Sequence, residues 1–202
     1  MTKNTYDTKQ LEDLLLQALQ TELGGAEVYT AAIECAVNHD LREEWKKYLD
    51  DTLTHRDVLM NVFSELGMDS KKVTVGREVV AHHGLSLVQA IRLAQASDTP
   101  AGAQIIAAEC VLLTETKDHQ TWELIGHLVK TVSGAAINVL RQAHEAVAKD
   151  GHHHFYRTKG WTRELWIQSL GLPAVLPPPE EVRKVETAIG AARAEQARAE
   201  ML

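Results

Sequence analysis

Residues 41–67 read LREEWKKYLDDTLTHRDVLMNVFSELG, and the spacing of their apolar side chains decides the fold class. Large side chains recur every three or four residues, a step that keeps them on one face of a helix. The members of this stripe are Leu41, Trp45, Tyr48, Thr52, His55, Leu59, Val62 and Leu66. A histidine in the middle of such a face would be desolvated unless it is paired or bound to a metal. The stretch therefore predicts a helix over 41–66 with a polar group buried near its midpoint.

Three other stretches show the same arrangement, and we expect helices over 8–37, 100–132 and 135–150. Each carries an apolar stripe that is interrupted by side chains able to bind a metal. These side chains are Glu22 in the first stretch, Glu115 and His119 in the next, and His144 in the last. One polar residue in a stripe is ordinary, whereas four helices that share the feature indicate one common site in a bundle.

The connections between these stretches predict the topology. The loop at 38–40 and the turn at 133–134 are short, so each joins antiparallel neighbours. The link from Gly67 to Pro100 is long enough to travel the length of the bundle, with a shorter helix near 87–97. Strand patterns are almost absent. We therefore expect an all-α fold, a ferritin-like four-helix bundle with one long crossover.

This topology places the two hairpin turns at opposite ends of the bundle. Glu22 and His55 lie about 17 residues from their turn, and His119 and His144 lie about 12 residues from theirs. The sum, about 29 residues, is close to the length of one helix. We therefore expect these four side chains at one level.

Composition limits the classes of function. The formal net charge of −7 argues against nucleic-acid binding, which requires clustered Lys and Arg. No apolar run approaches the 18 or so residues of a membrane span, and the first ten residues lack the apolar segment of a secretory signal. Cys35 and Cys110 are too few for a disulfide framework. We expect a cytoplasmic protein.

Two motifs in the first hairpin resemble known families. Glu22 and Tyr29 have the Glu-x6-Tyr spacing of the first helix of bacterioferritins and rubrerythrins, in which that Glu is a metal ligand. The stretch from Asp51 through His55 to Gly67 is similar to the Glu-Thr-x-x-His…Val-Phe-x-x-Leu-Gly motif of the YciE/YciF-like ferritin-like proteins.

Two shorter matches point to the same YciE/YciF-like family. Ala26-Glu27 resembles its first-helix Ala-Glu pair, and Glu115-x-x-Asp118-x-x-x-Trp122 more loosely resembles its third-helix Glu-x-x-Glu-x-x-x-Tyr. The resemblance covers roughly residues 10–150. It implies a small cytoplasmic ferritin-like protein, associated with stress and carrying a di-metal site.

The chain departs from the di-iron pattern at two positions. Such sites use Glu-x-x-His on the second and fourth helices, where the Glu bridges the metals. Here Thr52 precedes His55, and Arg141 precedes His144. Asp51 could replace the first carboxylate, because residues i and i+4 share a helix face. Nothing comparable serves the fourth helix, so we predict at most one tightly bound metal per chain.

The candidate metal ligands combine the stripes with the resemblance. They are Glu22, Glu27, Asp51, His55, Glu115, His119 and His144. Iron is the first choice of metal, with manganese and zinc as alternatives, since all three accept mixed imidazole and carboxylate ligands. The predicted function is that of a metal-binding, stress-type protein that acts on peroxide or oxygen. The alternative is a non-enzymatic assembly bundle with a decayed site, in which Arg141 neutralises Glu22 or Glu115 without a metal.

The sequence after residue 151 differs in character, so we expect a bundle domain over 1–151 and a helical appendage over 152–202. His152-His153-His154 reads as a solvated run beyond the fourth helix. A short helix with Trp161 and Trp166 follows, then Pro177-Pro178-Pro179 and a final helix from Glu180. Aromatic residues are favoured at interfaces, so a homodimer that uses residues 155–176 is expected. Docking of the appendage on its own bundle is the alternative.

Overall fold

The computed structural model describes residues 6–178, apart from the side chains of 148–152. This part of the chain forms five helices and contains no strand, which confirms the all-α prediction. The helices are α1 (Thr8–Cys35), α2 (His39–Leu66), α3 (Val75–Ser97), α4 (Pro100–Thr131) and α5 (Ala135–Ser169).

The helix ends follow local chemistry that the sequence displays. The Asp7 carboxylate accepts hydrogen bonds from two backbone N–H groups in the first turn of α1. Thr99 caps α4, and Pro100 occupies its first turn, where no N–H is needed. Gly67 ends α2 with φ at 65°, a left-handed conformation that glycine adopts without strain.

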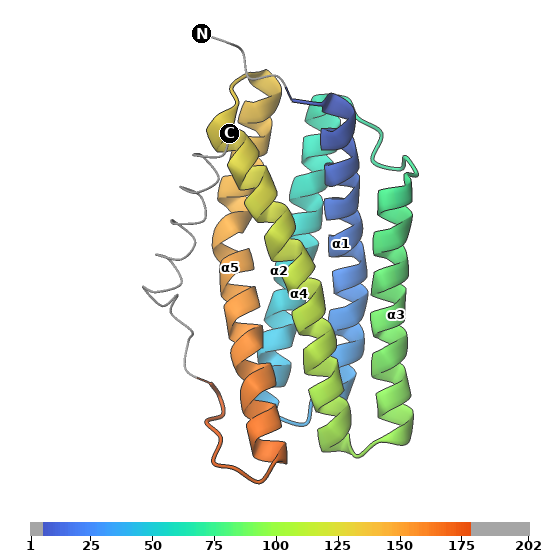
Figure 1. Cartoon of the computed structure of the whole chain (residues 1–202), viewed down its shortest axis with the longest axis vertical. Coiled ribbons are helices and arrows are strands. Elements are labelled where there is room, and N and C mark those ends of the chain that lie inside the picture. The colour runs from blue at the N-terminus through green and yellow to red at the C-terminus, as the bar shows by residue number, and fades with distance from the viewer. Residues whose placement is uncertain (1–5, 179–202) are drawn as a thin grey trace, which may run out of the picture.

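Four of the helices form a ring. α1 packs against α2 and α4, and α5 packs against the same two helices. Figure 1 shows that α2 and α4 run in one direction while α1 and α5 run in the other. α3 carries the chain back along the molecule between α2 and α4, and it packs on the outside of the ring against α1 and α4.

Two helices are longer than the sequence patterns predicted. α3 begins at Val75 rather than near 87, with Thr74 as its cap. α5 continues to Ser169, so the predicted stop at Asp150-Gly151 is wrong. The predicted domain boundary at 151 accordingly falls inside α5. Pro179 and the final helix predicted from Glu180 lie outside the described residues.

The apolar core consists of two clusters that lie on either side of a polar layer. One includes Val28, Trp45 and Trp161, and the other includes Leu59 and Val147. Trp161 is buried, so the first part of the predicted appendage packs on its own bundle, which was the alternative to an interface. The two clusters hold the four helices above and below the layer where the candidate site lies.

Candidate metal centre

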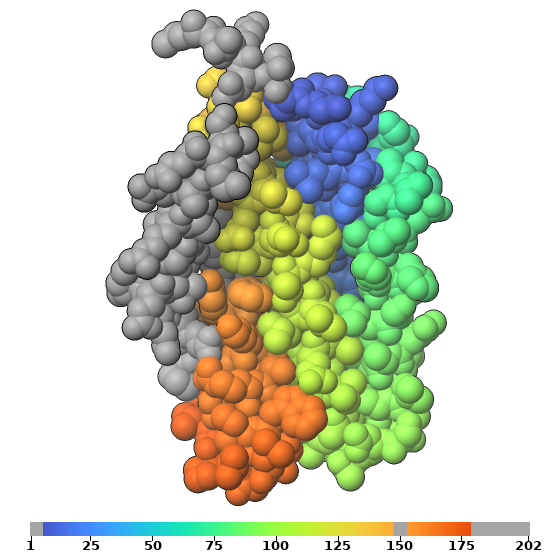
Figure 2. Space-filling model, in the orientation of Figure 1, coloured from blue at the N-terminus to red at the C-terminus, as the bar shows by residue number. Residues whose placement is uncertain are grey.

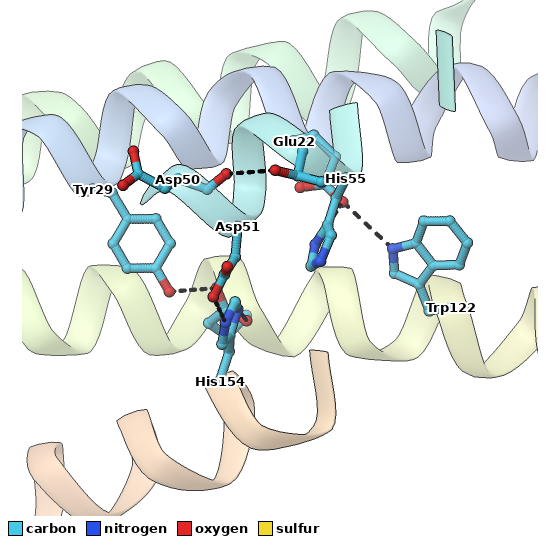
Figure 3. A network of polar contacts seen from close by, with 9 residues as sticks. Glu22, Tyr29, Asp50, Asp51, His55, Trp122 and His154 are labelled. Carbon is cyan, nitrogen blue, oxygen red and sulfur yellow. Dashed lines mark hydrogen bonds and ion pairs between the residues drawn. The ribbon is translucent and has the colours of Figure 1, made fainter. Parts of the chain in front are cut away.

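Five buried ionisable side chains lie between the two apolar clusters, and they come from the four helices of the ring. They are Glu22 from α1, His55 from α2, Glu115 and Asp118 from α4, and His154 from α5. None is more than 6% exposed. Figure 3 shows the labelled side chains of Glu22, His55 and His154 between the helices, with Tyr29 and Trp122 flanking them. Buried charges of this kind require partners or a metal.

Glu22 and Asp118 share a hydrogen bond across the α1–α4 interface. Burial, followed by the charges of Asp118 and Glu115, raises the pKa of Glu22 well above its ordinary value. Burial and the charge of Glu115 also raise the pKa of Asp118, to about 7. The Trp122 indole N–H donates to Glu22 Oε1 at 3.4 Å. The raised pKa of Glu22 favours its protonated form, in which its hydroxyl donates the shared hydrogen bond to Asp118.

Glu115 is held by Tyr29, whose hydroxyl donates to Oε1 at 2.6 Å. Burial raises the pKa of Glu115, while the facing His154 and the Tyr29 hydrogen bond lower it. Its second oxygen, Oε2, is buried and has no hydrogen-bond partner within the described part of the chain. The same holds for Oδ1 of Asp118. Two carboxyl oxygens with unused acceptor capacity therefore face the polar layer, and an unsatisfied buried acceptor is costly.

His154 is oriented by a carboxylate on each side of its ring. Its Nε2 lies 3.1 Å from Asp51 Oδ2, and its Nδ1 lies 4.0 Å from Glu115 Oε2. Burial alone would lower the pKa of His154, but the hydrogen bond with Asp51 and the charge of Glu115 raise it. The same hydrogen bond lowers the pKa of Asp51. A carboxylate that binds one ring nitrogen fixes the direction of the other, an arrangement common in metal-ligating histidines.

His55 lies beside His154 in the layer. Its Nδ1 lies 3.9 Å from Glu22 Oε1, and its ring stacks on that of His154 with centroids 6.0 Å apart. The two imidazoles therefore stand side by side, each facing a buried carboxyl group.

A small cavity of about 10 Å³ lies among these side chains, bounded also by Thr21, Gly25, Thr52 and Thr114. This is about the space that one water-sized sphere needs. Within the described residues, no three His, Cys, Asp or Glu side chains stand in a ready-made ligand arrangement. Two atoms that share one ion at about 2.1 Å each lie at most about 4.2 Å apart. The His55–Glu22 and His154–Glu115 separations of 3.9 and 4.0 Å are just inside that limit, so binding would need small side-chain rotations.

Of the seven ligands predicted from the sequence, the structure brings four together and separates three. Glu22, Asp51, His55 and Glu115 lie at the centre. Glu27 is exposed and lines a groove with Arg92 of α3. The His119 ring stacks on Phe155 with centroids 4.9 Å apart and its Nε2 lies 3.4 Å from Glu123.

The prediction that His144 shares the level of Glu22 is wrong. A Cβ built on Gly126 would lie 2.5 Å from His144 Nε2, so this imidazole rests against α4 near its far end. Gly126 is about eight residues, or roughly 12 Å, along α4 from Asp118, the hydrogen-bond partner of Glu22. The expected level was misplaced because α5 continues to Ser169 instead of ending near residue 150, so the polar layer lies further along α5 than the sequence predicted.

Two residues of the centre were not among the predicted ligands. Asp118 was named only as part of a motif that resembles a family, and His154 was assigned to a solvated run. A signal for His154 was present, because the stripe of α5 continues in steps of three and four from Val147 through residue 151 to His154, Thr158 and Trp161. A signal for Asp118 was present as well, because the steps from Glu115 through Asp118 to Trp122 are three and four residues.

Arg141 does not neutralise the buried carboxyl groups. Its guanidinium donates to the carbonyl of Val129, about 14 residues or roughly 21 Å along α4 from Glu115. The feature that favoured a decayed site therefore lies elsewhere in the bundle.

In comparisons with known proteins, no family model, curated protein or solved structure matches this chain. None of the described helices is both long and apolar enough to cross a membrane.

Proposed function

We propose that this protein is a ferritin-like four-helix bundle that binds one transition-metal ion in the polar layer between its two apolar clusters. The arrangement of α1, α2, α4 and α5 supports this, since two antiparallel hairpins are joined by a connection that runs the length of the molecule. The proposed ligands come from Glu22, His55, Glu115, Asp118 and His154.

The observation that carries the proposal is the orientation of His154. Its Nε2 is held by Asp51 while its Nδ1 faces the unsatisfied Oε2 of Glu115. An imidazole fixed in this way presents one nitrogen toward a carboxylate that has acceptor capacity to spare, as metal sites require. The mixed nitrogen and oxygen donors suit iron first, with manganese or zinc as alternatives.

The ligand set favours one ion rather than two. Thr52 stands three residues before His55, and Gly151 stands three residues before His154, so both Glu-x-x-His equivalents lack their bridging carboxylate. Asp118 supplies a further carboxyl group, but the cavity has room for about one small sphere. With iron or manganese bound, the centre would supply redox chemistry toward peroxide or oxygen, which fits a stress-related role in the cytoplasm.

The second candidate is a bundle whose polar layer is purely structural. The hydrogen bonds between Glu22 and Asp118 and from Tyr29 to Glu115 favour it, because they stabilise part of the layer without a metal. This candidate predicts a folded protein with no affinity for transition metals.

Two measurements separate the candidates. Elemental analysis of protein purified without added metal is expected to give one transition-metal ion per chain. Titration of metal-free protein with Co(II), followed by visible absorption, is expected to show one site that is weakened about 10- to 100-fold by Asp51→Asn.

Asp50→Asn is the matched control, because Asp50 is the exposed neighbour on the same helix. Equal Co(II) affinity in the two variants, or the absence of any Co(II) absorption band in the parent protein, would refute the metal centre and support the structural layer.

A further inference from the structure

A second and larger cavity lies beside the candidate centre, between α1, α3 and α4. Its volume is about 330 Å³. Figure 2 shows this face of the molecule, on which α3 and α4 flank α1. Val80, Leu87 and Leu113 provide apolar side chains in its lining, and it is bounded by all three helices.

Glycines create the space where α1 meets α3. A Cβ built on Gly84 would lie 3.3 Å from the Cα of Gly24, so the two backbones approach closely at this point. Both glycines line the cavity. Since neither carries a side chain, the helices come together while the volume beside the contact stays open.

Only a thin wall separates this cavity from the candidate centre. Thr21, Gly25 and Thr114 line both spaces. A Cβ built on Gly25 would lie 3.3 Å from Thr114 Cγ2 and 3.6 Å from Thr52 Cγ2, so the missing side chain leaves the wall thin between these threonines. A molecule in the larger cavity would therefore lie next to the polar layer.

The charged side chains of the lining are basic. Among the described residues that line the cavity, Lys117 alone has a permanent charge, His83 is a further basic group, and none is a carboxylate. An apolar cavity of about 150 Å³ holds benzene, so a volume about twice as large suits a molecule of about ten non-hydrogen atoms. The geometry and the charge together favour an apolar molecule with one anionic end.

We propose that this cavity binds a small apolar carboxylate, with its carboxylate at Lys117 and its apolar part along Val80, Leu87 and Leu113. Resting on the proposed function, a molecule bound here lies beside the metal centre and alters its surroundings across the wall of Thr21, Gly25 and Thr114. The cavity itself requires no metal, so its occupancy is measured separately.

The first test is calorimetric titration of metal-free protein with octanoate and with 1-octanol, which share a chain length and differ in charge. Lys117→Met is expected to weaken octanoate binding about fivefold, the effect of a partly exposed ion pair, and to leave 1-octanol binding unchanged. Lys130→Met is the matched control, because Lys130 is exposed near the end of the same helix and does not line the cavity. Leu87→Trp and Leu113→Trp are each expected to abolish binding of both molecules by filling the cavity.

Leu113 is 59% exposed, so its substitution tests occupancy without disturbing the core. Absence of octanoate binding to the parent protein, or undiminished binding to Leu113→Trp, would overturn the ligand site. Equal affinity for octanoate in the parent and Lys117→Met would overturn the assignment of its anionic end.

The second test asks whether the two sites communicate. Octanoate is expected to shift the visible absorption band of the Co(II)-loaded protein, and the shift is expected to be absent in Leu113→Trp. An unchanged band despite calorimetric binding would overturn the coupling between the cavity and the metal centre and leave a simple ligand site. Absence of any Co(II) band refutes the metal centre and that coupling with it, while the ligand site is decided by calorimetry on metal-free protein alone.

Discussion

Replacing Asp118 with Asn is expected to make the metal-free protein more stable at pH 8 and to weaken its binding of metal. Asp118 is buried in the layer between the apolar clusters, and it accepts a hydrogen bond from Glu22. An amide at this position accepts the same hydrogen bond through its oxygen and carries no charge. The substitution therefore removes a buried negative charge while preserving volume and the contact with Glu22.

The size of the effect follows from the pKa of Asp118. Its ordinary value is 3.8, and burial raises it to about 7 in the folded protein. The folded state therefore binds more protons than the unfolded state between these values, so stability falls as the pH rises from about 4 through 7. A difference of about 3 units corresponds to about 4 kcal/mol at most. Above pH 7 the variant avoids this loss, whereas near pH 4 the two proteins are expected to be equally stable.

Other ionisable groups of the layer also affect how the stability of the folded protein changes with pH. The raised pKa of Glu22 acts in the same direction as that of Asp118. The raised pKa of His154 contributes stability that is present below its unfolded value and is lost as the pH rises through the folded value. The lowered pKa of Asp51 contributes stability that is lost only in acid, as the pH falls through its folded pKa.

The measurement is urea unfolding of parent and variant at pH 4.5 and pH 8, in the presence of a chelator. Asp50→Asn serves as the exposed control and is expected to change stability by less than about 0.5 kcal/mol at either pH. Co(II) titration at pH 8 supplies the second readout. If Asp118→Asn destabilises the protein equally at both pH values, Asp118 is not a strained carboxylate and the argument from burial fails.

Three further outcomes are expected. His154→Ala should weaken Co(II) binding, measured by titration, while His144→Ala should leave it unchanged; the reverse result would restore the level predicted from the sequence. Leu59→Ala should cost about 2–5 kcal/mol by chemical unfolding, because it opens a cavity in a fully buried position, and a loss under 1 kcal/mol would place Leu59 outside the core. A homodimer that uses the exposed surface after α5 should dissociate in Leu170→Asp, as followed by analytical ultracentrifugation; an unchanged mass would exclude that surface.

The sequence predicts the helices well where local chemistry and periodicity agree. The Thr99-Pro100 start of α4 and the Gly67 end of α2 are present as predicted. Glu22, His55 and Glu115 are buried where their stripes placed them. The agreement has a physical basis, because side chains that are three or four residues apart lie on the same face of a helix.

The sequence fails where a local signal competes with tertiary packing. Asp150-Gly151 has the chemistry of a helix end, yet α5 continues through it. A glycine inside a helix costs about 1 kcal/mol, a loss that burial of Trp161 and Leu165 further along the same face outweighs. Because of this one misplaced boundary, the sequence predicted His144 as the ligand from the last helix, whereas His154 lies in the layer. Asp118 and His119 both fit the steps of three and four between Glu115 and Trp122, so spacing alone could not show which of the two faces Glu22.

The polar layer is costly for a bundle that needs only to fold. Three carboxyl groups and two imidazoles occupy positions that the surrounding stripes would fill with apolar side chains, and a well-packed apolar layer is often as stable or more stable. Within the described part of the chain, two of their oxygens have no hydrogen-bond partner, and an unsatisfied buried acceptor is costly. A bound cation would supply the partner that Glu115 and Asp118 lack, and it would offset the repulsion that raises the pKa of Glu22. The same cation would lie next to the larger cavity, whose lining is mostly apolar and includes Lys117. A structural network explains the hydrogen bonds of the layer but not the unsatisfied oxygens, so the Co(II) titration of the parent protein decides between the two proposals.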